Sequence, residues 1–188
     1  ILLAGASGDT GRAVLDVLSG TDLTVRALTR SAGKERRLRK LGADEVVIGD
    51  LYDPTEASRA VTGVDAVLST VGMNASEIWT ATQYVDDVGT INLLEAAEDN
   101  GVSSFVMESS LGVGGDRGSL MAETFRIALN PVIEAKTRAE AAIRDSELRY
   151  TIFRPGSLVG GWASGPVQVA DAGSGFWGIT SRQDVARF

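Results

Sequence analysis

Three glycines spaced three residues apart stand near the start of the chain, between an apolar run at 1–4 and a helical pattern at 13–18. Glycine suits a turn in which the backbone takes a positive φ or a helix touches a strand. The first amides of a helix are unpaired and its dipole is positive there, so such a turn can hold a phosphate. A strand before and a helix after are the context that a dinucleotide site requires. We therefore assign cofactor binding to the residues of this turn, which are Gly5, Ala6, Ser7, Gly8, Asp9, Thr10, Gly11 and Arg12.

An arginine occupies the position that distinguishes NAD from NADP. In NAD-selective sites an acidic residue about 20 positions after the glycines binds the ribose 2′-hydroxyl. Here Arg30 lies 19 residues after Gly11. A guanidinium suits a 2′-phosphate, and Arg12 and Lys34 could add positive charge. The alternative is a solvated surface arginine; the pattern favours NADP over NAD.

A basic run at 34–40 has two interpretations, a nucleic-acid patch or a solvated helix face. It spans about two helical turns, contains no aromatic residue and belongs to a chain with a net charge of −7. That acidic balance argues against broad nucleic-acid binding. We expect a solvated face that draws in the cofactor's phosphates.

Four candidate residues follow the third and fourth predicted strands. Asp50 could accept a hydrogen bond from the adenine amino group while Leu51 covers a face of the ring; alternatively, Asp50 caps a turn. Val71 and Gly72 come after the next strand, where close approach of the backbone to a ribose requires a small residue. We include all four in the predicted cofactor site.

Two serines and a lysine form the candidate catalytic group. Ser109 and Ser110 follow the fifth predicted strand, and Lys136 lies on a later helix. The lysine could bind ribose hydroxyls, and a serine could bind a substrate carbonyl at the nicotinamide end. Alternatively, the serines satisfy loop backbone groups and the lysine is a helix-surface charge.

Strands and helices alternate along the chain, and their order must bring these residues together. Apolar or β-rich runs predict strands at 1–4, 23–28, 45–48, 65–68, 104–107 and 150–153. Helices are predicted at 31–41, 54–61, 76–99 and 132–146, with a helix start at 181–184 and a candidate short strand at 167–169. This order predicts an α/β fold with a Rossmann-like, doubly wound parallel sheet in three layers, α/β/α. Residues 154–180 are expected to form a small, loop-rich substrate-side segment.

The composition limits the class of protein. A length of 188 residues suits a single domain, 1–188, and both ends are expected to be truncated because the chain starts in mid-strand and stops in a helix. The absence of histidine and cysteine excludes a Ser-His-Asp triad and thiol catalysis, and we expect no metal site. No apolar run predicts a membrane span and no signal peptide is visible, which favours the cytoplasm.

Motifs in a fixed order resemble the atypical short-chain dehydrogenase/reductase superfamily, in particular its NmrA-like, NAD(P)-binding branch. The matching segments cover nearly the whole chain and are 5–12, 49–51, 88–97, 109–113, 136–140, 150–156 and 181–186. The resemblance implies a Rossmann fold with the 5–12 turn on the pyrophosphate, Arg30 on the 2′-phosphate, and Asp50 and Leu51 at the adenine. Pro155, in one of these segments, is also assigned to the cofactor site.

One departure from the family pattern limits what the resemblance implies about catalysis. Active relatives use a Tyr-x-x-x-Lys pair for proton transfer, assisted by a serine. Lys136 matches the lysine, but Val132 stands at the tyrosine position. We expect an NADPH-dependent reductase of a small planar acceptor, quinone- or flavin-like, that works without the tyrosine. The alternative is a non-catalytic redox sensor or assembly factor of the NmrA-like type; a sugar-nucleotide epimerase or dehydratase, which needs the tyrosine, is disfavoured.

Aromatic residues gather in the tail, on the expected substrate side: Trp162, Phe176 and Trp177. They could stack on a planar small-molecule substrate. Equally, they could pack the loops or form a surface for a protein partner.

Overall fold

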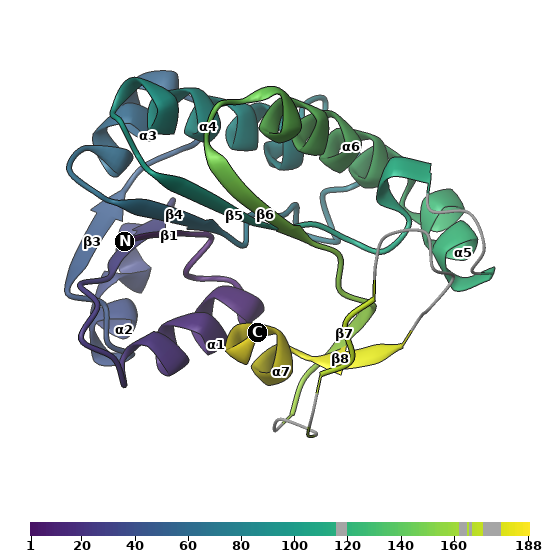
Figure 1. Cartoon of the computed structure of the whole chain (residues 1–188), viewed down its shortest axis with the longest axis horizontal. Helices are drawn as coiled ribbons and strands as arrows, with labels where there is room; N and C mark the ends of the chain where they lie inside the picture. Colours follow the sequence, from purple (N-terminus) through teal and green to yellow (C-terminus); the bar gives the residue numbers. More distant parts are fainter. Residues whose placement is uncertain (116–119, 162–164, 166, 171–177) are drawn as a thin grey trace.

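A six-stranded, fully parallel sheet forms the centre of the computed structural model (Figure 1). The structure describes residues 1–115, 120–161, 165, 167–170 and 178–188. The strand order is β3-β2-β1-β4-β5-β6. The strands are β1 (Leu2–Ala4), β2 (Arg26–Thr29), β3 (Glu45–Ile48), β4 (Ala66–Ser69), β5 (Ser104–Glu108) and β6 (Arg149–Phe153). The direction of winding reverses between β1 and β4, so the predicted Rossmann-like, doubly wound fold is confirmed.

Helices cover both faces of this sheet (Figure 1). One layer contains α3 (Pro54–Val61), α4 (Thr90–Asp99) and α6 (Asn130–Asp145), and the opposite layer contains α1 (Asp9–Leu18), α2 (Glu35–Lys40) and α7 (Arg182–Arg187). A separate hydrophobic core lies on each face. Leu2, Leu3 and Ala4 of β1 are fully buried, as expected of a central parallel strand that is covered on both sides.

The predicted helix at 76–99 is wrong in its first half. Regular α-helix begins at α4, and it is preceded by a π-helical turn, η2 (Val85–Gly89). The side chains of Asp86 and Asp87 form ion pairs with two cations on α6, Lys136 and Arg138 respectively. Asp87 also accepts a hydrogen bond from the next backbone amide, at 2.7 Å, which competes with regular helical bonding. At η2 the local helical pattern is therefore overridden by tertiary ion pairs.

The C-terminal segment also differs from the prediction. Residues 167–169 form no strand, and Val167 and Val169 are exposed. A separate two-stranded parallel sheet is made instead by β7 (Ser157–Val159) and β8 (Ile179–Ser181). Helix α5 (Leu120–Ala128) and the short turns η1 (Ala32–Lys34) and η3 (Val113–Gly115) were not predicted separately. Within the described ranges, every helix is too short or too polar to cross a membrane.

Candidate functional site

The glycine turn allows β1, α1 and β4 to approach more closely than side chains would permit. Gly5 has a φ of +78°, and a Cβ built on it would lie 2.6 Å from the Thr70 carbonyl oxygen. A Cβ on Gly11 would lie 2.3 Å from the carbonyl oxygen of Gly5. The Gly8 amide donates to that same oxygen at 2.9 Å. Glycine is thus required at both ends of the turn, which explains the spacing in the sequence.

The first backbone amides of α1 have no side-chain cap and can bind an anion. The N-cap of the helix is Gly8, which has no side chain to cap these amides. Arg12 is engaged within the turn, because it pairs with Asp9 and donates to the Ser7 carbonyl at 2.8 Å. The Lys34 ammonium lies 3.4 Å from the Ser7 hydroxyl, so η1 adds positive charge beside the turn.

Three side chains gather beyond the ends of β2 and β3. Arg30 is exposed and makes no hydrogen bond or ion pair with any of the described residues. Burial raises the pKa of Tyr52, while the neighbouring Arg30 charge lowers it and that of Asp50 raises it. Asp50 accepts a hydrogen bond from the Tyr52 amide at 3.1 Å, so Asp50 does cap a turn, as the alternative interpretation of the sequence predicted. The Leu51 side chain is buried in the core, and its carbonyl accepts from Asn92.

The candidate catalytic lysine is buried and fully engaged with the protein. Its ammonium lies 3.1 Å from Asp86 Oδ1, 3.2 Å from the Glu108 carbonyl oxygen and 3.3 Å from the Val71 carbonyl oxygen. The contact with Asp86 is an ion pair, and the two contacts with carbonyl oxygens are hydrogen bonds. Asp86 is fully buried, and its other oxygen accepts from the Met73 amide at 2.8 Å. Lys136 therefore ties together the ends of β4 and β5, turn η2 and helix α6.

The two candidate serines have different environments. Ser109 is buried and donates to Glu140 Oε1 at 2.5 Å, so this hydroxyl is committed to the interior rather than offered to a substrate. Burial opposes ionisation of Glu140, but hydrogen bonds from Arg154, Ser109 and Arg144 together hold its pKa below the usual value. Ser110 is half-buried and makes a long contact of 3.3 Å to the Leu111 carbonyl. Of the pair, Ser110 has the hydroxyl that can turn toward a ligand.

The remaining predicted residues lie around the same edge of the sheet. Gly72 faces Asp86, with 3.6 Å between a built Cβ and the carboxylate. The Pro155 carbonyl accepts from the Leu111 amide at 3.1 Å, which joins the end of β6 to the serine loop. Val132 is buried in α6, one turn before Lys136. Trp162, Phe176 and Trp177 lie outside the described residues.

Sequence reasoning missed three polar residues of this region. Asp86 was hidden inside a predicted regular helix, and Tyr52 had no distinguishing pattern. Glu108 did carry a signal, because it is a charged residue at the end of an apolar strand. Its carboxyl is buried, and burial raises its pKa even though Lys136, the Thr10 hydroxyl and Arg182 act in the opposite direction.

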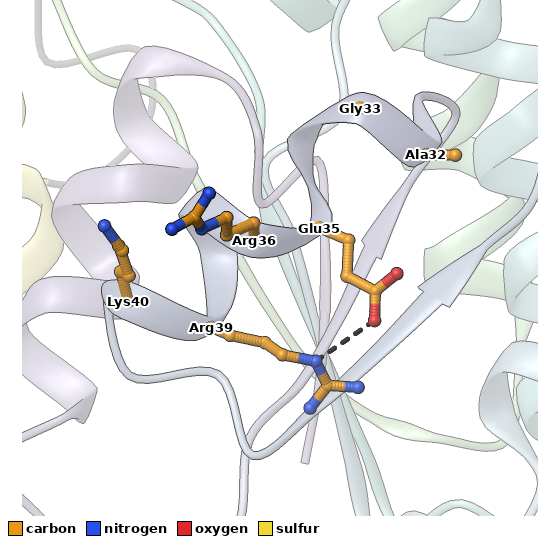
Figure 2. Close-up of a pocket in the computed structure, with 6 residues that line it drawn as sticks. All are labelled: Ala32, Gly33, Glu35, Arg36, Arg39 and Lys40. Carbon is orange, nitrogen blue, oxygen red and sulfur yellow. Dashed lines mark hydrogen bonds and ion pairs between the residues drawn. The ribbon is translucent and has the colours of Figure 1, made fainter.

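The basic helix α2 presents a shallow depression with a volume of about 510 Å³. Figure 2 shows Arg36 and Lys40 extending from one side of this helix and the Glu35–Arg39 ion pair, at 3.1 Å, on another. The basic side chains are exposed, which agrees with the predicted solvated face. Within the described part of the chain, no group of three or more carboxylates is placed to hold a metal ion.

The residues at the strand ends fit a dinucleotide. The glycine turn provides space for a backbone-bound pyrophosphate, and the helix behind it has no side-chain cap at its N-terminus. The exposed Arg30 guanidinium has no partner among the described residues. Together with the switch in strand order, these features define a Rossmann-type dinucleotide-binding protein.

Comparison with known proteins identifies the family. A model for NAD(P)H-binding proteins matches residues 5–188, so the chain belongs to this NAD(P)H-binding family, within the atypical short-chain dehydrogenases/reductases. It is 32% identical over 189 residues to the uncharacterized sugar epimerase YhfK of Bacillus subtilis (strain 168), covering 100% of this chain and 84% of that protein. It is 29% identical over 194 residues to the sanguinarine reductase of Eschscholzia californica, covering 84% and 69%.

A solved structure resembles the whole fold. The anaerobillin reductase ChuY of Escherichia coli O157:H7 superposes with a TM-score of 0.78 and 26% identity. The match covers 99% of this chain and 86% of that chain.

Proposed function

We propose that this protein is an NADPH-dependent reductase of a small planar acceptor, quinone- or flavin-like. The observation that carries the proposal is that the glycine turn has the shape a dinucleotide requires while a buried valine, Val132, occupies the position of the catalytic tyrosine. Quinone- and flavin-like acceptors can take their proton from water, so they need no positioned tyrosine. Two relatives have reductase names, the sanguinarine reductase and ChuY. An epimerase, as one relative is named, would lack the proton-transferring tyrosine here.

Each residue of the site has a defined part in this proposal. The bound cofactor supplies the hydride. The first amides of α1 hold its pyrophosphate, and Arg30 holds its 2′-phosphate. Ser110 donates a hydrogen bond to the acceptor's carbonyl or ring nitrogen. Lys136 keeps the ends of β4 and β5 in place through contacts that already exist in the free protein.

We expect Arg30→Ala to weaken NADPH binding by about tenfold or more, because it removes a charge-assisted hydrogen bond of about 1.5–3 kcal/mol. Affinity for NADH, which lacks the 2′-phosphate, should stay the same. Titration calorimetry with both cofactors measures the difference. Arg149→Ala, an exposed arginine at the start of β6, at the opposite edge of the sheet, is the matched control and should leave both affinities unchanged. Equal affinities of the wild type for NADPH and NADH would refute the NADP preference.

The reductase is tested by adding NADPH with a panel of quinones and flavins and following the absorbance of the reduced nicotinamide. We expect turnover with at least one planar acceptor. Ser110→Ala should lower kcat by about tenfold or more, since one positioned donor is lost, with cofactor affinity unchanged. Ser110→Thr retains the hydroxyl and should retain most of the activity.

The redox sensor is the second candidate, and one observation favours it. The Lys136 ammonium forms an ion pair with Asp86 and hydrogen bonds with two backbone carbonyls, and Ser109 is bonded to Glu140. The catalytic group of active relatives is therefore largely occupied by structural contacts. Tight NADPH binding combined with no oxidation by any acceptor in the panel would support the sensor and overturn the reductase.

A further inference from the structure

Two buried side-chain oxygens of this region, Asp86 Oδ1 and Glu108 Oε1, have no hydrogen-bond partner among the described residues. Of these two, Asp86 Oδ1 has an ion-pair partner, Lys136, at 3.1 Å. The buried Glu140 carboxylate accepts hydrogen bonds from Ser109, Arg144 and Arg154. Glu108 is only 7% exposed, yet its Oε1 atom has no hydrogen-bond partner among the described residues. A buried polar atom without a partner is uncommon in a folded protein and points to a ligand or a functional group.

The Glu108 carboxyl lies next to the cofactor turn. The residue ends β5, where its backbone carbonyl accepts from Lys136. The preceding residue, Met107, belongs to the core shared with α4 and α6. Because side chains alternate along a strand, Glu108 faces the opposite layer. On that side the Thr10 hydroxyl, in the first turn of α1, and the Arg182 charge, at the start of α7, are near enough to lower the pKa of Glu108.

This position belongs to the nicotinamide half of the fold. A dinucleotide spans the two halves of a doubly wound sheet, across the reversal in strand order. Arg30 and Asp50 place the adenosine at β2 and β3, so the nicotinamide end lies over β4, β5 and β6. Glu108 stands between the pyrophosphate turn and this half.

The chemistry of the cofactor provides a partner that matches a neutral carboxyl. A protonated carboxyl has one O–H donor and one carbonyl acceptor. The carboxamide of nicotinamide has N–H donors and a carbonyl acceptor, so the two groups can form a pair of reciprocal hydrogen bonds. We propose that Glu108, in its neutral form, binds the nicotinamide carboxamide of the cofactor through such a pair. The proposal rests on cofactor binding and does not depend on the identity of the acceptor.

A pH dependence follows from this pairing. The charged groups that act on Glu108 are Lys136 of α6 and Arg182 of α7, and α1 contributes the Thr10 hydroxyl. Because the neutral form binds, the affinity for the cofactor has its full value at pH values below the pKa of Glu108. It decreases as the pH rises through that pKa. Burial raises that pKa above the usual glutamate value, so the decrease occurs at a higher pH than for an exposed glutamate.

The experiment measures binding by calorimetry for wild type, Glu108→Gln and Glu108→Leu. The ligands are NADP+ and its 3-acetylpyridine analogue, in which a methyl ketone replaces the carboxamide. Glutamine also offers one donor and one acceptor, so Glu108→Gln should bind NADP+ within about threefold of wild type at low pH. Its affinity should show only the pH dependence that the 2′-phosphate of NADP+ causes, without the decrease that the titration of Glu108 adds in wild type. Glu108→Leu should bind NADP+ about tenfold more weakly than wild type, as expected for the loss of two neutral hydrogen bonds.

The analogue shows which cofactor group is bound. The loss caused by Glu108→Leu should be several-fold smaller for the acetylpyridine analogue than for NADP+, because the amide donor is absent. Equal losses for both ligands would overturn the assignment. If Glu108→Leu does not fold, identical pH dependences of the affinity in wild type and Glu108→Gln would overturn it instead. If the protein showed the expected binding pattern but none of the acceptors in the panel led to oxidation of NADPH, the reductase would be refuted and the Glu108 assignment would stand.

Discussion

Gly11→Ala is expected to abolish measurable cofactor binding and to destabilise the fold. The added Cβ would lie 2.3 Å from the Gly5 carbonyl oxygen and 2.8 Å from the Cα of Ala6. Both are backbone atoms, so no side-chain rotation relieves the contact, and α1 must move away from β1. Overpacking of this kind costs about 1–3 kcal/mol of stability. Two lost charge-assisted hydrogen bonds to the pyrophosphate, at about 1.5–3 kcal/mol each, correspond to a loss of affinity of about a hundredfold or more.

Two other glycines provide the matched controls for this prediction. A Cβ on Gly20, at the end of α1, would meet only the Val17 carbonyl oxygen at 3.6 Å, an ordinary contact. Gly20→Ala should therefore leave the affinity for NADPH unchanged. Gly8→Ala, with 3.3 Å to the Gly5 carbonyl, should give an intermediate effect. Thermal unfolding and calorimetry measure both quantities, and a Gly11→Ala variant that bound NADPH like wild type would refute the role of the turn.

The second large effect concerns Lys136→Met. The substitution leaves Asp86 fully buried and without its cation, and the carbonyls of Val71 and Glu108 lose their donor. Breaking one partner of a buried ion pair costs about 3–5 kcal/mol. We expect the free energy of unfolding to decrease by this amount, as measured by denaturant unfolding.

An exposed ion pair and a double substitution test the explanation. Arg39→Met breaks the pair with Glu35 on the surface of α2, where both side chains are largely exposed, and should cost less than about 1 kcal/mol. Lys136→Met combined with Asp86→Asn removes both charges and should recover part of the stability lost by Lys136→Met alone. If Lys136→Met were as stable as wild type while turnover disappeared, the lysine would be a catalytic residue and not a clamp.

This distinction changes the interpretation of the family motif. In active relatives the lysine serves a tyrosine, and the valine at the tyrosine position removes that partner here. The structure gives the lysine a different partner, a buried carboxylate on a π-helical turn. Loss of activity in a Lys136 variant therefore requires a stability measurement beside it before it can be assigned to catalysis.

The order of strands and helices could be predicted because it depends on local patterns. Apolar runs such as 1–4 and turn residues such as Gly42 and Pro54 determine where elements begin and end. The helix predicted at 76–99 was wrong at η2 because its apolar spacing is helical while Asp86 and Asp87 form ion pairs with α6. Their partners are about 50 residues away, beyond what periodicity detects.

The dinucleotide turn was determined by the sequence itself. Its glycines are required by close contacts within a few residues, between Gly5 and Gly11, and such contacts repeat wherever the strand–turn–helix unit occurs. The contacts of Lys136, Ser109 and Glu108 were decided by the tertiary structure alone. Each depends on which groups from distant strands and helices are buried beside the residue. A buried polar group that has a partner in the protein is structural, whereas one without a partner is available to a ligand.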